Sequence, residues 1–121
     1  MIRFALLALT LLAPLPLLAA TVTTPGPVTL APLDVSTVTT GGTAVNAIVA
    51  GGRTAGGWIS NGTAATAPLC INEVGAATTT QSGATTCIAP GQSYVVAPAT
   101  GPVSVNATDA AHVFSGLALR Q

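Results

Sequence analysis

The sequence predicts an all-β protein: a small, single-domain antiparallel β-sandwich, or a jelly-roll-like barrel, of about seven to nine short strands. Two observations predict this fold class. Short apolar runs are broken by Gly, Pro, Asn and Thr about every eight to twelve residues, a spacing typical of sandwiches and barrels. No stretch after residue 20 sustains a helical period.

Nine segments are expected to form the strands, because each combines apolar residues with neighbouring turn residues. In chain order they are Val28–Leu30, Asp34–Val38, Ala44–Val49, Gly57–Asn61, Leu69–Val74, Ala84–Ile88, Ser93–Ala97, Val103–Asn106 and His112–Leu119. A period of two places Val45, Ala47 and Val49 on one face of their strand. Two turns are predicted: a tight hairpin turn at Asn61-Gly62, for which Pro68 farther on favours a longer loop, and an exposed hairpin tip in GAATTTQSG.

Residues 1–20 are predicted to form the helix of a secretory signal peptide. Arg3 precedes an apolar run from Phe4 to Leu18, and the small residues Ala19 and Ala20 follow. The run is shorter than the roughly 20 residues of a spanning helix and holds two prolines. We therefore expect cleavage after Ala20 and no membrane insertion of the mature chain. The expected organisation is a signal peptide (1–20), an extended Pro/Thr-rich arm with an edge strand (21–40) and a β-sandwich domain (41–121).

Cys70 and Cys87 are the only cysteines. Export would carry them into an oxidising compartment, so a disulfide is expected, at the base of the hairpin whose tip is GAATTTQSG. Two free thiols are the alternative. Closing a loop of roughly 15 residues contributes about 3 kcal/mol in the chain-entropy model. A core built mostly of Ala and Val would gain from such a cross-link.

The chain has no Lys, and its charged side chains are three Arg and three acidic residues. This composition excludes nucleic-acid binding, which needs clustered cations. It also excludes electrostatic binding to an anionic membrane, for the same reason. Nearly neutral surfaces self-associate readily, so a homo-oligomer is one expectation.

No catalytic residue, cofactor or metal site is assigned. His112 lies three residues after Asp109, and serines stand at 93, 104 and 115, but no Gly-x-Ser-x-Gly elbow surrounds any of them. Paired carboxylates for glycoside cleavage and a set of zinc ligands are also missing from the pattern. An enzyme is therefore not expected.

Four residues are candidate contacts for a ligand or partner: Trp58, Arg53, Tyr94 and His112. Trp58 is interpreted first as sheet packing and second as a platform on which a sugar stacks. Arg53, in AGGRTAGG, is interpreted first as a solvated loop cation and second as a partner of Glu73.

An ordered series of motifs resembles small β-sandwich proteins common in bacteriophage and prophage structural gene sets. The motifs are GGTAVNAIVAGGRTAGGWISN, PLCINEVGAA, IAPGQSYVVAP and GPVSVNATDAAHVFSG. The matching residues are Arg53, Gly57, Ile59, Asn61, Leu69, Ile71, Asn72, Gly75, Ala76, Pro90, Gly91, Tyr94, His112 and Phe114. The resemblance runs from Gly41 to Gly116, about two thirds of the chain, and implies a structural role.

Together these features predict a non-enzymatic protein, exported to the periplasm or the exterior, with a structural, surface or adhesion-type role toward an unknown protein or glycan. One alternative is a phage or prophage virion decoration or fibre component that retains its leader. Another is a secreted carbohydrate-binding module, in which Trp58 or Tyr94 would contact the glycan.

Overall fold

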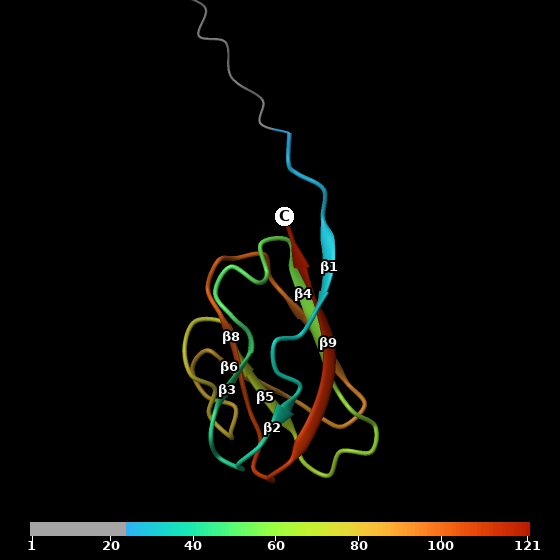
Figure 1. The fold of residues 1–121 in the computed structure, drawn as a ribbon. Helices are drawn as coiled ribbons and strands as arrows, with labels where there is room; N and C mark the ends of the chain where they lie inside the picture. Colours follow the sequence, from blue (N-terminus) through green and yellow to red (C-terminus); the bar gives the residue numbers. More distant parts are fainter. Residues whose placement is uncertain (1–23) are drawn as a thin grey trace, which may run out of the picture.

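The structure, a computed structural model, describes residues 24–121, which form two antiparallel sheets with nine strands and no helix. The arrangement is consistent with a β-sandwich (Figure 1). Within these residues no helix is long and apolar enough to cross a membrane. The predicted signal peptide and its cleavage after Ala20 lie outside the described residues.

The first sheet contains five strands. Four of them follow the order β1 (Thr29–Pro32), β9 (His112–Arg120), β4 (Gly56–Asn61), β7 (Ser93–Val96). The short β2 (Thr37–Val38) pairs with the beginning of β9, beyond the region that β1 covers. The long central strand β9 therefore organises this sheet.

The second sheet contains four strands in the order β3 (Val45–Ile48), β8 (Val103–Asn106), β5 (Leu69–Asn72), β6 (Thr85–Ile88). From β2 onward the chain changes sheet at every connection except the one between β5 and β6, which are the only consecutive strands that pair with each other. Residues far apart in sequence thus meet in most pairings, as in Ile59↔Gly116 and Val45↔Val105.

All nine predicted strands are present, with ends that differ by at most three residues. The differences have local causes. Asp34 is outside β2 because its carboxylate accepts a hydrogen bond from the Val49 amide, 2.9 Å away. β5 ends at Asn72 because the Asn72 side chain accepts hydrogen bonds from the amides of Val74 and Gly75 and so forms a turn.

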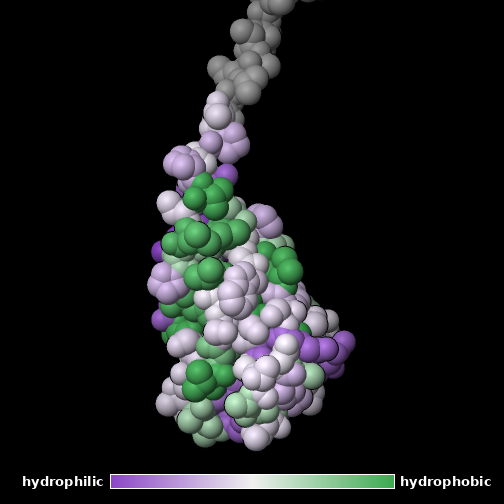
Figure 2. Space-filling view, turned by 90° about the vertical axis from the view of Figure 1, so that its right-hand side faces the viewer, coloured by the Kyte–Doolittle hydropathy of each residue, from purple (hydrophilic) through white to green (hydrophobic). Residues whose placement is uncertain are grey.

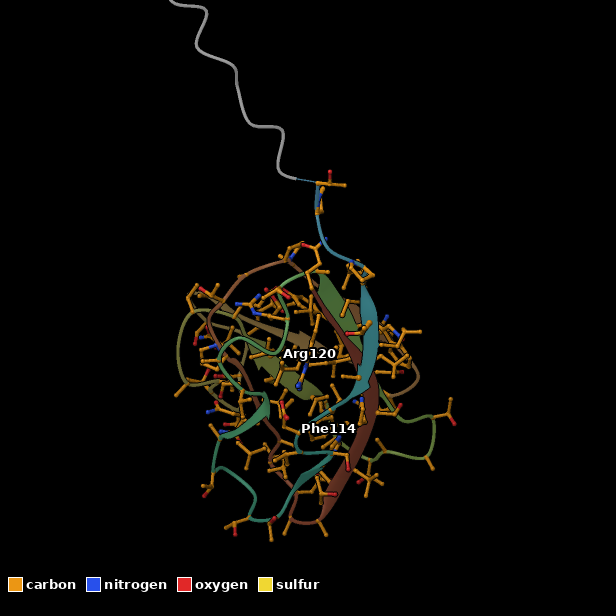
Figure 3. The ribbon with its side chains drawn as sticks, turned by 45° about the horizontal axis from the view of Figure 1, so that its top comes forward. Phe114 and Arg120 are labelled. Atoms are coloured by element: carbon orange, nitrogen blue, oxygen red, sulfur yellow. A yellow bond between two sulfur atoms is a disulfide. The ribbon has the colours of Figure 1, made fainter. Side chains whose placement is uncertain are left out.

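A core of apolar side chains from both sheets holds the sandwich together. It comprises Val38, Ala47, Ile48, Ile59, Leu69, Ile71, Ile88, Val96, Val103, Val105, Ala107, Phe114 and Ala118. Phe114 and Arg120 both extend from β9 on its inner side (Figure 3). Because most core residues are small, the apolar area that each buries is modest.

The predicted disulfide between Cys70 and Cys87 is confirmed, with sulfurs 2.02 Å apart. The two cysteines are direct cross-strand partners in the β5–β6 pair. They lie at the base of the predicted hairpin, whose tip carries the Thr-rich tract. The cross-link therefore joins two strands of one sheet rather than the two sheets.

The tight hairpin turn predicted at Asn61-Gly62 is wrong. β4 pairs with β7 and β9, and the chain after Asn61 crosses to the second sheet before β5 begins. Gly62 is not among the glycines with positive φ. The Asn61 side chain instead donates hydrogen bonds to the carbonyls of Ala67 and Ile88, which fold the crossing segment back against the core.

Candidate functional site

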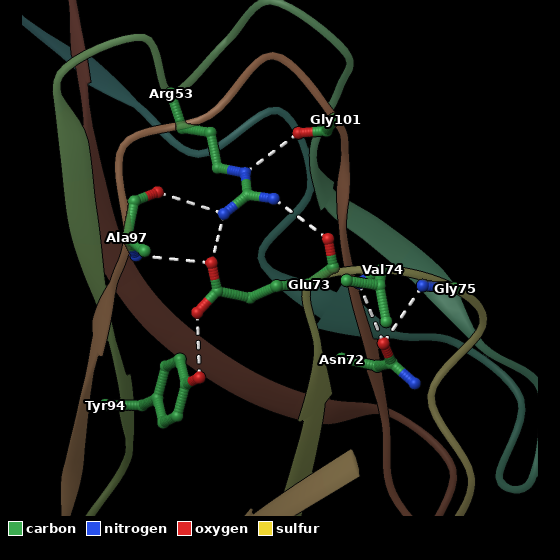
Figure 4. A network of polar contacts seen from close by, with 8 residues as sticks. All are labelled: Arg53, Asn72, Glu73, Val74, Gly75, Tyr94, Ala97 and Gly101. Carbon is green, nitrogen blue, oxygen red and sulfur yellow. Dashed lines mark hydrogen bonds and ion pairs between the residues drawn. The ribbon is translucent and has the colours of Figure 1, made fainter. Parts of the chain in front are cut away.

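Arg53 is buried, with 2% of its surface exposed, although it belongs to the loop between β3 and β4. Its guanidinium forms an ion pair with the Glu73 carboxylate. It also donates to the carbonyls of Gly101 at 2.8 Å, Ala97 at 2.9 Å and Glu73 at 2.9 Å (Figure 4). The interpretation of Arg53 as a solvated loop cation is wrong, because four of its five N–H groups are used inside the fold.

Glu73 is the centre of this cluster. One carboxylate oxygen accepts from Arg53 and from the Ala97 amide, and the other accepts from the Tyr94 hydroxyl at 2.7 Å. Because of the turn made by Asn72, the carboxylate and the backbone carbonyl of Glu73 both accept hydrogen bonds from the Arg53 guanidinium (Figure 4). The cluster joins the end of β5 in the second sheet to β7 in the first.

Tyr94 remains a hydrogen-bond donor in this cluster. Burial raises the pKa of its phenol, the hydrogen bond and negative charge of Glu73 raise it further, and Arg53 opposes them to a smaller extent. Two of the candidate contacts, Arg53 and Tyr94, are therefore brought together by Glu73. Both have their polar groups engaged within the protein.

His112, at the start of β9, is 3% exposed and has acceptors at both ring nitrogens. Nδ1 lies 2.8 Å from Asp109 Oδ1, and Nε2 lies 2.9 Å from Asn61 Oδ1. The Asn61 amide nitrogen donates to two carbonyls, so its oxygen must face the ring. Both ring nitrogens are therefore engaged inside the protein.

Asp109 is the exposed end of the His112 cluster. Burial alone would raise the pKa of its carboxyl, but hydrogen bonds from His112, its own backbone and Thr66 lower the pKa overall. The cluster borders a shallow pocket of about 390 Å³ lined mostly by small side chains. Its walls are Gly62, Ala64, Ala65, Thr66, Asp109, Ala111, His112 and Val113.

The geometry does not assemble an Asp-His-Ser triad. Asp109 does contact His112, but the opposite ring nitrogen contacts Asn61 where a triad would need a serine hydroxyl. The Ser104 hydroxyl accepts a hydrogen bond from the Ala77 amide. Among residues 24–121 no group of three His, Cys, Asp or Glu side chains is placed to hold a metal ion.

Trp58 lies on the outer face, defined here as the side of the first sheet that is turned away from the second. Its neighbour Ile59 points into the core, and Trp58 is 39% exposed. The register of the sheet places four apolar residues side by side across four strands. This apolar row consists of Val95, Trp58, Leu117 and Pro32.

Further apolar residues extend the row, and a polar row borders it. Leu119 pairs with Leu30, and each lies two residues away from the apolar row along its own strand. On the other side, Ser60 pairs with Ser93 and with Ser115. Figure 2 shows hydrophobic side chains gathered in the upper half of the molecule, on the side that carries β1 and β9. None of these positions is charged.

Each arginine of residues 24–121 forms an ion pair within the protein: Arg53 with Glu73, and Arg120 with Asp34 at 3.3 Å. The third carboxylate, Asp109, contacts the His112 ring. Each buried side-chain nitrogen and oxygen in this part of the chain has a hydrogen-bond partner. The polar groups that could bind an ionic ligand are therefore largely occupied.

A scan against protein-family models, a search of curated proteins and a search of solved structures found no match to this chain. The fold and the geometry of its clusters are therefore the basis for the proposals that follow.

Two residues that organise these clusters were not identified as site residues from the sequence. The sequence suggests Glu73 as a partner of Arg53, and Asn61 as a turn residue and a match to the resemblance. Each lies at the end of a strand, where a polar side chain follows buried apolar residues. That pattern was the available signal, but it does not reveal which distant groups the side chain meets.

Proposed function

We propose that the protein is a non-enzymatic, exported β-sandwich module with a structural, surface or adhesion-type role, and that it acts through the outer face. The observation that carries the proposal is a contrast between two kinds of side chain. The charged groups of residues 24–121 contact partners inside the protein, whereas large apolar side chains, Val95, Trp58 and Leu30, are exposed on the outer face of the first sheet.

No catalytic role is proposed, because the side chains that could carry out catalysis are engaged inside the protein. A general base must reach a substrate proton, but both ring nitrogens of His112 have partners inside the protein. Arg53 has no exposed face with which to hold an anion. These residues stabilise the fold instead.

Export is supported by the disulfide, because such bonds persist in oxidising compartments and are rare in the cytosol. The apolar leader predicted from the sequence is the second support.

A carbohydrate-binding role is the second candidate, and the position of Trp58 favours it. An indole on a flat sheet face, beside a row of serine hydroxyls, can stack on the apolar face of a sugar while hydroxyls reach its rim.

The experiment is intact mass without reduction on cytoplasm, periplasm, medium and any phage particles from cells that express the whole chain. A chain that begins at Thr21, lacks two hydrogens and lies outside the cytoplasm is the expected result. A full-length, reduced chain in the cytoplasm or in particles would overturn the export proposal, and its presence in particles would favour a virion protein.

A further inference from the structure

We propose that the outer face is a self-association surface, on which the apolar row of one copy packs against the same row of a second copy. The inference rests on the proposed function, because it names the partner of the same face. It starts from the pattern of exposure. Val95 is 80% and Leu30 72% exposed, values that are high for aliphatic residues on a sheet face.

The pattern of charge favours a second copy over other partners. In a two-fold interface the same surface meets itself, so a charged residue near the axis would face its own equivalent. The apolar row and the flanking serine row contain no charged residue. The nearest ionic groups are closed in their own pairs, so identical faces can meet without repulsion between like charges.

The two rows are also complementary to themselves. Aliphatic side chains and the Trp58 ring from facing sheets can interdigitate, as side chains do between the sheets of a sandwich. Serine hydroxyls can both donate and accept, so a serine row that meets a serine row leaves no group without a partner.

The size of the face sets the expected strength. Four strands about 4.8 Å apart, paired over roughly 20 Å, present roughly 400 Å² per copy. The two copies together would bury about 800 Å², below the 1,200 Å² typical of stable complexes. Association should therefore be weak and reversible between isolated copies, and stronger where many copies are held together on a surface.

Sedimentation analysis tests the proposal, using the protein recovered from cells that express the whole chain. Wild type is compared with Val95→Lys, which places a charge in the apolar row, and with Val74→Lys as the matched control. Val74 is 84% exposed but lies after β5, away from the outer face. The same N-terminus must be verified by mass in each sample.

We expect the average mass of wild type and Val74→Lys to rise toward that of a dimer with concentration, and the Val95→Lys dimer to be at least tenfold weaker. A second variant, Leu30→Lys, should weaken association in the same way. Circular dichroism identifies any variant that fails to fold.

Two results would overturn the proposal. One is a wild-type protein that stays monomeric at millimolar concentration, and the other is a Val95→Lys variant that associates as wild type does. A monomeric protein whose Trp58 fluorescence shifts on addition of cellohexaose or an N-acetylglucosamine hexamer would assign the face to a glycan instead. Failure here leaves the mass experiment unaffected, so failure of export and failure of self-association remain distinguishable.

Discussion

Glu73 connects two parts of the chain that lie far apart in sequence: a loop arginine, and β7 with the residue that follows it. A buried guanidinium is costly unless it is paired and its N–H groups are bonded. In this protein both conditions are met, so the pair is tolerated and fixes how the loop before β4 sits against the second sheet.

Replacement of Glu73 by Ala should destabilise the protein strongly, by about 3–5 kcal/mol, because it leaves Arg53 charged, buried and unpaired. The shift in urea midpoint measures the loss. The matched control is Arg120→Ala, which removes an ion pair at the surface and should cost about 1 kcal/mol or less. Equal losses from the two substitutions would contradict the structural role given to Glu73.

The Asp109 carboxylate should make stability sensitive to acid. Its pKa in the folded protein is lowered below the ordinary value of 3.8, so the unfolded chain takes up this proton first as the pH falls. The stabilisation is therefore fully present above about pH 4 and is lost as the pH falls through the lower, folded pKa.

The test compares urea midpoints of wild type and Asp109→Asn from pH 5 downward. The difference between them should be full at pH 5 and should shrink below about pH 4. A difference that stays constant down to pH 2 would show that the carboxylate charge is not what stabilises the His112 cluster.

At the scale of the elements, the pairing of β4 with β9 depends on glycine. Gly116 faces Ile59 across the strands, and an added Cβ would collide with the Trp58 carbonyl oxygen. The two strands can therefore approach closely only with glycine at this position. The β5–β6 hairpin depends on a different device, since its long Thr-rich tip has few apolar contacts and its base is cross-linked.

Removal of the disulfide should lower the free energy of unfolding by about 3 kcal/mol without changing the fold, because the bond closes a short loop. The double substitution Cys70→Ala, Cys87→Ala is compared with wild type by thermal melting, with and without a reductant. Reductant should lower the melting temperature of wild type toward that of the variant and leave the variant unchanged. A variant as stable as oxidised wild type would show that the disulfide does not stabilise the protein.

In the molecule as a whole, the few charged side chains of residues 24–121 all contact partners within the protein, which leaves a surface of low net charge. Its exposed apolar residues are unevenly distributed, and several share the outer face. Recognition by this part of the chain should therefore depend on shape and apolar area rather than on long-range electrostatics.

The protein should accordingly bind neither duplex DNA nor anionic vesicles, even at about 50 mM salt, where electrostatic binding is strong. Fluorescence anisotropy and vesicle flotation measure the two interactions. A variant with lysine at Val74, Val95 and Val113, all exposed, serves as the positive control for added charge. Salt-sensitive binding of wild type to either probe would contradict the neutral surface described here.

The fold class, the approximate strand positions and the disulfide follow from the sequence alone, because these depend on local patterns. Alternation of apolar residues, the turn residues between runs and two cysteines beside one turn are all short-range signals. The same reasoning failed at Asn61-Gly62 and at Arg53. Each was interpreted from its neighbours in sequence, whereas its partners lie on strands far along the chain.

Which residues meet depends on the packing of the whole fold. The register of β4 between β7 and β9 aligned Val95, Trp58 and Leu117 into one row, and a shift of one residue would have turned Trp58 toward the core. The crossing of the chain between sheets brought Glu73 to Arg53, and Asn61 to His112. Long-range pairing is set by the packing of the whole core, so these contacts have no signature in any short stretch of the sequence.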